Sequence, residues 1–106
     1  MKAKVTKNSM FKKHVIVRAD RAGVFFGVLK SKKNDVVVMT NVRKIWYWNG
    51  ANAIEQIALD GIREQNKKDC KLTVIIDEME INGVIQVIPA TQKCIDSLNS
   101  IAIWKL

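Results

Sequence analysis

The stretch VVVMTNVRKIWYW, residues 36–48, decides the fold, because it is a long run of residues that favour extended backbone. β-Branched and aromatic side chains pack well on a pleated surface, so such runs are typical of strands. Two shorter runs of the same kind precede it, at residues 14–19 and 24–31. Together the three runs predict an antiparallel meander, in which the third strand is interrupted near Asn41.

The segments between these runs carry turn signals. Residues 20–23 end in Gly23, which can adopt a positive φ, and residues 32–35 form a polar loop of a length common in hairpins. Within the second run, Gly27 has no side chain to pack and therefore indicates a bulge or a close approach of two backbones. These signals favour antiparallel pairing between strands that are neighbours in sequence.

A helix is predicted after the third strand, following a break at Asn49-Gly50. Asn52 is the expected N-cap, with Glu55 three residues later as in a capping box. Apolar residues recur at helical spacing over about residues 51–63, at Ile54, Ile57, Ala58 and Ile62. The pattern therefore predicts one main helix with an apolar face.

The C-terminal half predicts further strands and a short helix. Residues 66–71 have the composition of a charged loop, and strands are predicted at residues 72–76 and 78–88, the second divided by a turn at Asn82-Gly83. Pro89 ends the last strand, and Thr91 can cap a short helix. The residues that this helix would bury are Cys94, Ile95 and Leu98. Residues 101–104 are predicted to pack back onto the sheet, and the order of elements favours an α+β fold.

Length and composition indicate one domain. The chain has 106 residues, of which 48% are hydrophobic and 26% charged, which is ordinary globular composition. Residues 1–12 are predicted to form a basic arm, for which a flexible tail is one interpretation, and residues 13–106 a single ligand-binding domain. No apolar run reaches the roughly 18 residues needed to span a bilayer, and the lysine-rich start lacks the apolar segment of a signal peptide. We expect no membrane association and a protein that stays where it is made.

The net charge of +8 is unevenly distributed along the chain. Residues 1–50 carry a net charge of +10, whereas residues 51–106 carry −2. Such segregation indicates a positive face able to attract phosphates. The lysines of a basic tail explain part of the excess, but a tail does not account for Arg18, Arg21 or Arg43.

The residues that usually carry catalysis or hold metals are few. The single histidine, His14, has no partner at a recognisable spacing, and Cys70 and Cys94 match no zinc signature. A disulfide between the two cysteines is one alternative, and two reduced, buried thiols are the favoured one. The acidic residues Asp77, Glu78 and Glu80 are typical of a solvated surface. We therefore expect no enzymatic activity, no metal and no cofactor.

Arginines and aromatic residues form the remaining chemical pattern. Arg18 and Arg21 flank the first turn, Phe25 follows it, and Arg43 precedes the aromatic block of residues 46–48. Arginine suits phosphate because its planar fork donates parallel hydrogen bonds, and an aromatic ring can stack on a base. In a strand, Trp46 and Trp48 would share one face and Tyr47 the other. The alternative is that all three aromatic residues form core or a dimer interface.

Three parts of the sequence together resemble a family of small bacteriophage proteins. They are residues 17–19 together with 22–27, residues 42–51, and residues 87–91 together with 103–105; the most specific is the block Arg-x-Ile/Leu-Trp-Tyr-Trp-x-Gly-Ala at residues 43–51. The family is the first-described Thoeris anti-defence family. Its members act as sponges that capture glycocyclic ADP-ribose signals made by TIR-domain enzymes without cleaving them, and some also hold cyclic oligonucleotides.

The resemblance, which runs from about residue 13 to the end, implies a phage protein acting in the cytoplasm of an infected bacterial host. It also implies a homodimer, or dimers assembled into a hexamer, with ligand pockets at subunit boundaries. The basic arm and Arg21 depart from the family's pattern. On chemistry, the candidate ligand-binding residues are Arg18, Arg21, Phe25, Arg43, Trp46, Tyr47, Trp48 and Asn52.

The leading functional hypothesis is therefore capture of a cyclic ADP-ribose-type signal, because this ligand offers an adenine to stack, a pyrophosphate for arginine and ribose hydroxyls for Asn52. It predicts that Arg43→Ala weakens capture and leaves the melting temperature nearly unchanged. One alternative is a basic nucleic-acid-binding accessory phage protein, although the sequence lacks a recognition helix. Another is a structural phage protein that uses the aromatic strand as an interface.

Overall fold

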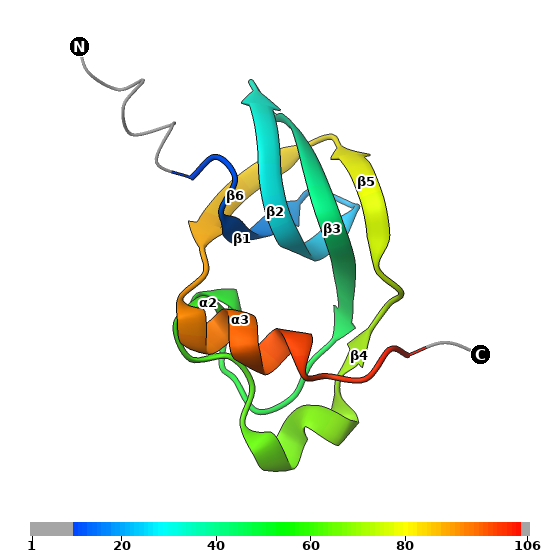
Figure 1. Cartoon of the computed structure of the whole chain (residues 1–106). Helices are drawn as coiled ribbons and strands as arrows, with labels where there is room; N and C mark the ends of the chain where they lie inside the picture. Colours follow the sequence, from blue (N-terminus) through cyan, green and yellow to red (C-terminus); the bar gives the residue numbers. More distant parts are fainter. Residues whose placement is uncertain (1–9, 105–106) are drawn as a thin grey trace.

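The computed structural model describes residues 10–104, so most of the arm predicted over residues 1–12 lies outside the described part (Figure 1). The α+β architecture and the antiparallel meander are confirmed. Its elements are β1 (His14–Ala19), β2 (Gly23–Lys33), β3 (Val36–Tyr47), α2 (Ile54–Asp60), the 3₁₀ helix η1 (Glu64–Asp69), β4 (Lys71–Leu72), β5 (Ile76–Ile81), β6 (Val84–Pro89) and α3 (Gln92–Asn99). No helix in this part of the chain is long and apolar enough to cross a membrane.

The strands form one antiparallel sheet in the order β4-β3-β2-β1-β6, and β5 also pairs with β3. β4 and β5 lie one after the other along the same edge of β3. The strand predicted over residues 72–76 is wrong, because pairing stops after Leu72 and resumes at Ile76. Between them, the backbone N–H of Lys44 donates to Thr73 Oγ1 at 3.0 Å, so a side chain replaces a main-chain partner.

The sheet curls until its two outer strands meet. β5 and β6 lie at opposite edges, yet only Asn82 and Gly83 connect them. In a flat sheet, four steps of about 4.8 Å would put these edges about 19 Å apart, whereas three Cα–Cα steps span at most about 11 Å. The sheet must therefore bend, and hydrogen bonds from Val84 N to Asp35 O and from Asp20 N to Gly83 O, both 2.8 Å, hold the predicted turn.

Two apolar clusters occupy the two faces of the curled sheet. Val15 and Val17 belong to a cluster formed by strand residues, while Ile16 between them belongs to a cluster shared with α2 and α3. Because successive strand residues point to opposite faces, β1 is buried on both sides. This explains the uninterrupted apolar run at residues 15–17. The two thiols, Cys70 and Cys94, are buried on the helix side.

Gly27 and Asn41 lie at a bulge between β2 and β3. The pairing register shifts by one residue between Phe26 and Val28, and Asn41 adopts a φ of 49°. A Cβ on Gly27 would lie 2.9 Å from Val42 Cα. The predicted close backbone approach is therefore confirmed, whereas the predicted interruption at Asn41 is a bulge within a continuous strand.

Gly27→Ala is expected to lower the free energy of unfolding by about 1–3 kcal/mol, the usual cost of overpacking a tight site. The added methyl group would meet Val42 Cα and, at 3.0 Å, Thr40 O, and neither backbone atom can rotate away. Urea denaturation followed by circular dichroism measures the loss. An unchanged midpoint would show that β3 moves aside without cost.

The main helix is shorter than predicted and starts later. α2 covers Ile54–Asp60 instead of residues 51–63, and its N-cap is Ala53, which makes no side-chain capping bond. The prediction that Asn52 caps the helix is wrong, because its backbone N–H instead donates to Gln56 Oε1 at 2.8 Å. Gly61 ends α2, and η1 replaces much of the loop predicted at residues 66–71.

The C-terminal elements match their prediction more closely. Thr91 Oγ1 accepts a hydrogen bond from Cys94 N at 3.1 Å and so caps α3. α3 buries Cys94 and Leu98, and Ile95 packs against the same cluster. The tail then returns to the sheet, where Trp104 N donates to Leu72 O at 2.9 Å.

Candidate functional site

A hollow of about 290 Å³ lies where the end of β3 turns into α2, and we call it the Trp48 hollow. It brings together three of the residues predicted from sequence: Arg18, Trp48 and Asn52. Its complete lining is Arg18, Val24, Trp48, Asn52, Ala53, Ile54 and Glu55. The site therefore combines a cation, an indole ring, a carboxamide and a carboxylate.

Strand pairing fixes the position of Arg18 in this hollow. Arg18 on β1 lies opposite Val24 on β2 and opposite Gln86 on β6. Its neighbour Ile16, two residues away and on the same face of the strand, belongs to the helix-side cluster. Arg18 is therefore exposed on the side of the sheet that faces the start of α2.

Trp48 lies just beyond the last residue of β3, Tyr47, and is half-buried. Its ring packs against the helix-side cluster that includes Ile54. An indole held in this way by packing presents its remaining surface to the hollow at little cost in side-chain entropy. It is therefore positioned to stack on a flat ligand.

Glu55 is ionised at neutral pH. Its Oε2 accepts a hydrogen bond from Gln86 Nε2 at 3.0 Å, and this bond is the main reason that the pKa of Glu55 lies below its ordinary value. The backbone N–H of Glu55 and the positive charge of Arg18 lower the pKa further. The Trp48 hollow thus carries one positive and one negative charge.

Arg43 is not available to a ligand, which corrects the prediction. Its side chain is buried with 3% of the residue exposed, and its guanidinium donates only to backbone carbonyls. Nε donates to Thr73 O at 3.1 Å, Nη1 to Leu98 O at 3.0 Å, and Nη2 to Leu72 O at 3.4 Å and Ala102 O at 3.3 Å. Burial lowers the pKa of Arg43 from its ordinary value. Arg43 therefore ties β4, α3 and the tail together.

Phe25 is also misassigned, because it is buried in the cluster formed by strand residues. Only 5% of Phe25 is exposed, and the Lys44 ammonium lies 5.9 Å from its ring centroid, so the ring is not open to a ligand. Arg21 is exposed in the β1–β2 turn with a φ of 68° and does not line the Trp48 hollow. Neither residue belongs to the candidate site.

The other two aromatic residues of the block also lie outside the Trp48 hollow. Trp46 and Tyr47 are exposed at the end of β3, where the pairing with β4 shifts register between Ile45 and Tyr47. Trp46 stacks on Trp104 with ring centroids 5.0 Å apart, and the Lys71 ammonium lies 5.1 Å and 5.3 Å from the two centroids. This exposed pair forms a surface separate from the hollow.

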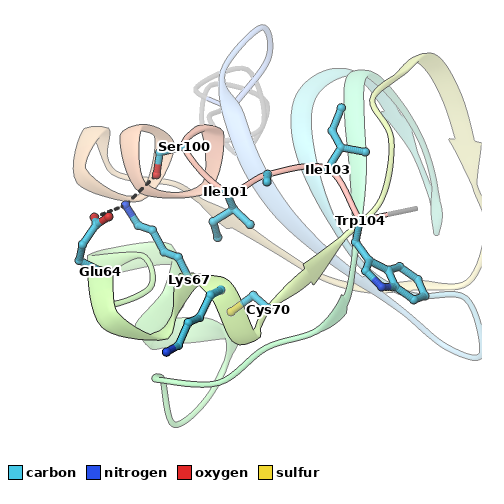
Figure 2. A pocket seen from close by; sticks show the side chains of 9 residues that line it. Glu64, Lys67, Cys70, Ser100, Ile101, Ile103 and Trp104 are labelled. Atoms are coloured by element: carbon cyan, nitrogen blue, oxygen red, sulfur yellow. Dashed lines mark hydrogen bonds and ion pairs between the residues drawn. The ribbon is translucent and has the colours of Figure 1, made fainter. Parts of the chain in front are cut away.

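Another hollow, of about 380 Å³, lies between η1 and the C-terminal tail (Figure 2). Figure 2 shows Lys67 reaching toward Glu64 and Ser100, to which its ammonium donates at 2.8 Å and 2.7 Å. The charge of Lys67 is therefore already compensated within the protein. The Trp48 hollow is the stronger candidate, because it gathers three of the residues predicted from sequence and this hollow gathers none.

Sequence reasoning missed four residues of the Trp48 hollow: Val24, Ala53, Ile54 and Glu55. The place of Val24 in the hollow could have been predicted from strand pairing, since Val24 is the partner of Arg18 across the β1–β2 turn. Glu55 was predicted only as part of a capping box, and no local signal indicated that β6 would place Gln86 beside it. Its role in the site depends on a contact between distant parts of the chain.

Other reactive groups are isolated from one another. Burial raises the pKa of the Cys94 thiol to about 12, so it is protonated at neutral pH. The His14 ring stacks on Phe26 with centroids 5.5 Å apart, and burial lowers the pKa of His14. Within residues 10–104, no three histidine, cysteine or acidic side chains gather as metal ligands would.

The chain matches a known protein family. The sequence profile of a protein family described as a domain of unknown function (DUF6948) matches residues 12–98. This span includes the whole sheet, both α-helices up to Leu98, and every residue that lines the Trp48 hollow. No curated protein sequence matches the chain.

Proposed function

The chain belongs to the DUF6948 family, and from the chemistry of the Trp48 hollow we propose that it binds and sequesters a nucleotide signal without cleaving it. The proposed ligand is a cyclic ADP-ribose-type molecule of the glycocyclic kind, with cyclic oligonucleotides as a related class. The proposed setting is the cytoplasm of a bacterium infected by a phage that encodes this protein, in line with the resemblance to the Thoeris anti-defence family.

One observation supports this proposal: a single hollow is lined by Arg18, Trp48, Asn52 and Glu55. An indole can stack on adenine, and a stacked base contributes about 1–3 kcal/mol. A carboxylate and a carboxamide can bond ribose hydroxyls, and arginine can bond phosphate. These groups match the parts of an adenine nucleotide.

Sequestration requires affinity and not turnover. A dissociation constant in the low nanomolar range corresponds to about −12 kcal/mol. Stacking, charge-assisted hydrogen bonds and burial of the ligand at a subunit boundary together can supply this amount. A protein that only binds needs no catalytic pair beside the ligand.

Isothermal titration calorimetry with a glycocyclic ADP-ribose isomer tests the proposal. We expect near-stoichiometric binding that weakens only modestly between low and high salt, because stacking and hydrogen bonding are less screened than phosphate contacts. Chromatography of the ligand released by heating should show it intact. Absence of heat at both salt concentrations would overturn the proposal for this ligand, and a cleaved product would overturn sequestration.

Trp48→Leu is expected to weaken binding of that ligand by about tenfold to a hundredfold, because a stacked base is worth about 1–3 kcal/mol. Leucine keeps an apolar side chain against the helix-side cluster and so limits the loss of stability. The same change at Trp46 is the matched comparison, since Trp46 lies outside the hollow. If Trp46→Leu weakens ligand binding more than Trp48→Leu does, the ligand binds at the exposed Trp46–Trp104 pair and not in the Trp48 hollow.

We also propose that the protein is a homodimer, or dimers assembled into a hexamer. Exposed apolar side chains near the end of β3, the start of β5 and the tail support this, because monomers rarely expose many large apolar residues together. They include Trp46, Ile75, Ile76, Ile103 and Trp104. Light scattering coupled to size-exclusion chromatography measures the mass, and a monomer at micromolar concentration would contradict the proposal.

The surface formed by Trp46, Trp104 and Lys71 supports a second candidate function, the binding of single-stranded nucleic acid. The Trp46–Trp104 stack, with the Lys71 ammonium over both rings, combines aromatic side chains with a cation, as in single-strand binding surfaces. Titration with a fluorescent oligonucleotide distinguishes this function. Tight binding that falls steeply with salt would favour it over signal capture.

A further inference from the structure

A polar hollow of about 380 Å³ adjoins the Trp48 hollow and shares Asn52 with it; we call it the Arg63 hollow. It lies between the loop that follows β3 and the start of η1. Its lining residues are Asn49, Gly50, Ala51, Asn52, Gln56, Arg63 and Asn66. The chain between β3 and α2 therefore has a hollow on each side.

The two hollows differ in charge. The Arg63 hollow is lined by one cation and four carboxamides and by no acidic residue. Arg63 is exposed and forms no ion pair with any side chain of residues 10–104. The Trp48 hollow, by contrast, contains the Glu55 carboxylate beside Arg18. A phosphate would be attracted to the Arg63 hollow without opposition, whereas in the Trp48 hollow the Glu55 carboxylate offsets the attraction of Arg18.

Local contacts hold the walls of the Arg63 hollow in place. The Cys70 sulfur lies 3.6 Å from Asn49 O and 3.5 Å from Asn66 O, so its single S–H is shared between a carbonyl of each wall. A Cβ on Gly50 would lie 2.7 Å from the Asn66 side chain, which shows that the loop and η1 are in direct contact. Gln56 is held by the hydrogen bond from Asn52 N. These contacts hold the backbone of both walls and the carboxamide of Gln56.

We infer that the Arg63 hollow holds the diphosphate of the ligand while the Trp48 hollow holds its nucleoside, with the ligand crossing over Asn52. This inference rests on the proposed function and assigns a part of the ligand to each hollow. The Arg63 guanidinium and the carboxamide N–H groups donate to phosphate oxygens. Trp48 stacks on the base, and the Glu55 carboxylate accepts a ribose hydroxyl. The chemical class recognised is a nucleoside that carries a diphosphate.

Calorimetry with two probes tests the assignment: adenosine, which lacks phosphate, and a glycocyclic ADP-ribose isomer, which contains a diphosphate. Arg63→Ala is expected to weaken binding of the ADP-ribose isomer by about tenfold to a hundredfold, the range for a lost hydrogen bond to a charged group. Its affinity for adenosine should stay within about twofold of the unmodified protein. Trp48→Leu should weaken both probes. Lys68→Ala is the control, because it removes a nearby exposed cation that lines neither hollow.

The outcomes separate the inference from the proposed function. If the unmodified protein binds the ADP-ribose isomer and Arg63→Ala leaves that affinity unchanged, the assignment is wrong while signal capture stands. If Arg63→Ala and Lys68→Ala weaken binding equally, the effect is one of general charge, and the assignment is again overturned. If the unmodified protein binds neither probe, the proposed function fails and the inference fails with it.

Discussion

Arg43→Ala is expected to lower the free energy of unfolding by about 3–5 kcal/mol, comparable to breaking a buried charged pair. Four backbone carbonyls, those of Leu72, Thr73, Leu98 and Ala102, lose the guanidinium as a donor at once, although Leu72 O still accepts from Trp104 N and Leu98 O from Ile101 N. A buried acceptor without a partner costs about 1–3 kcal/mol, and water entering the vacated space offsets part of the sum. The melting temperature should therefore fall by about 15 °C or more. This reverses the expectation from sequence that stability would be nearly unchanged.

Thermal and urea denaturation of Arg43→Ala, Arg43→Lys and Arg21→Ala tests whether the loss of stability comes from the hydrogen bonds of Arg43. Arg21→Ala removes an exposed arginine from a turn and should change stability by no more than about 0.5 kcal/mol. Arg43→Lys keeps the charge, but a compact ammonium cannot reach four carbonyls, so an intermediate loss is expected. This variant provides a measurement even if Arg43→Ala does not fold. A stability of Arg43→Ala equal to that of Arg21→Ala would show that the four hydrogen bonds contribute nothing.

Gly61→Ala is expected to cost about 2–5 kcal/mol, because two separate penalties add. Gly61 has a φ of 72° and a ψ of −154°, a region that only glycine occupies readily and that costs other residues about 1–3 kcal/mol. In addition, the new methyl group would lie 2.3 Å from Ser97 Cβ, at the contact between α2 and α3. Overpacking of this kind adds about 1–3 kcal/mol. Urea denaturation measures the total.

A double-mutant cycle separates the two penalties. Ser97→Gly in the Gly61→Ala background removes the atoms that collide but leaves the backbone conformation unchanged. Ser97→Gly alone should also destabilise the protein, because Ser97 Oγ accepts from Ile62 N and donates to Ile62 O. The expected signature is a favourable coupling energy of more than about 1 kcal/mol between the two changes. If the effects of the two substitutions on the free energy of unfolding are additive, the whole cost of Gly61→Ala comes from the backbone conformation at residue 61.

Local patterns in the sequence were sufficient to predict most of the secondary structure. The bounds of β1, the Thr91 cap and the close approach at Gly27 each depend on residues near one another in sequence. The β4–β5 break could not be predicted in this way, because it depends on the side chain of Thr73 and on the burial of Arg43. Both effects arise only when distant segments pack together.

The candidate site could be predicted only in part, because the positions of its side chains also depend on packing between distant segments. An arginine within a strand is ordinarily exposed, and the four carbonyls that surround Arg43 come from residues 72–102, far along the chain. The three aromatic residues at 46–48 look equivalent in sequence, but β3 ends at Tyr47, and only Trp48 turns into the hollow. Arg18 and Asn52 were predicted as site residues from their chemistry. The pairing of β1 with β2 and β6 then places Arg18 at the Trp48 hollow.

The closure of the sheet through Asn82-Gly83 determines the order in which this protein can fold during synthesis. The three strands of the meander are local in sequence and can pair as soon as residue 47 leaves the ribosome. β1, however, acquires its second neighbour only when β6 arrives, about 70 residues after β1. Until then the outer edge of β1 carries unpaired N–H and C=O groups beside the apolar run at residues 15–17. The nascent chain therefore exposes an unpaired edge with an apolar run until β6 has been made.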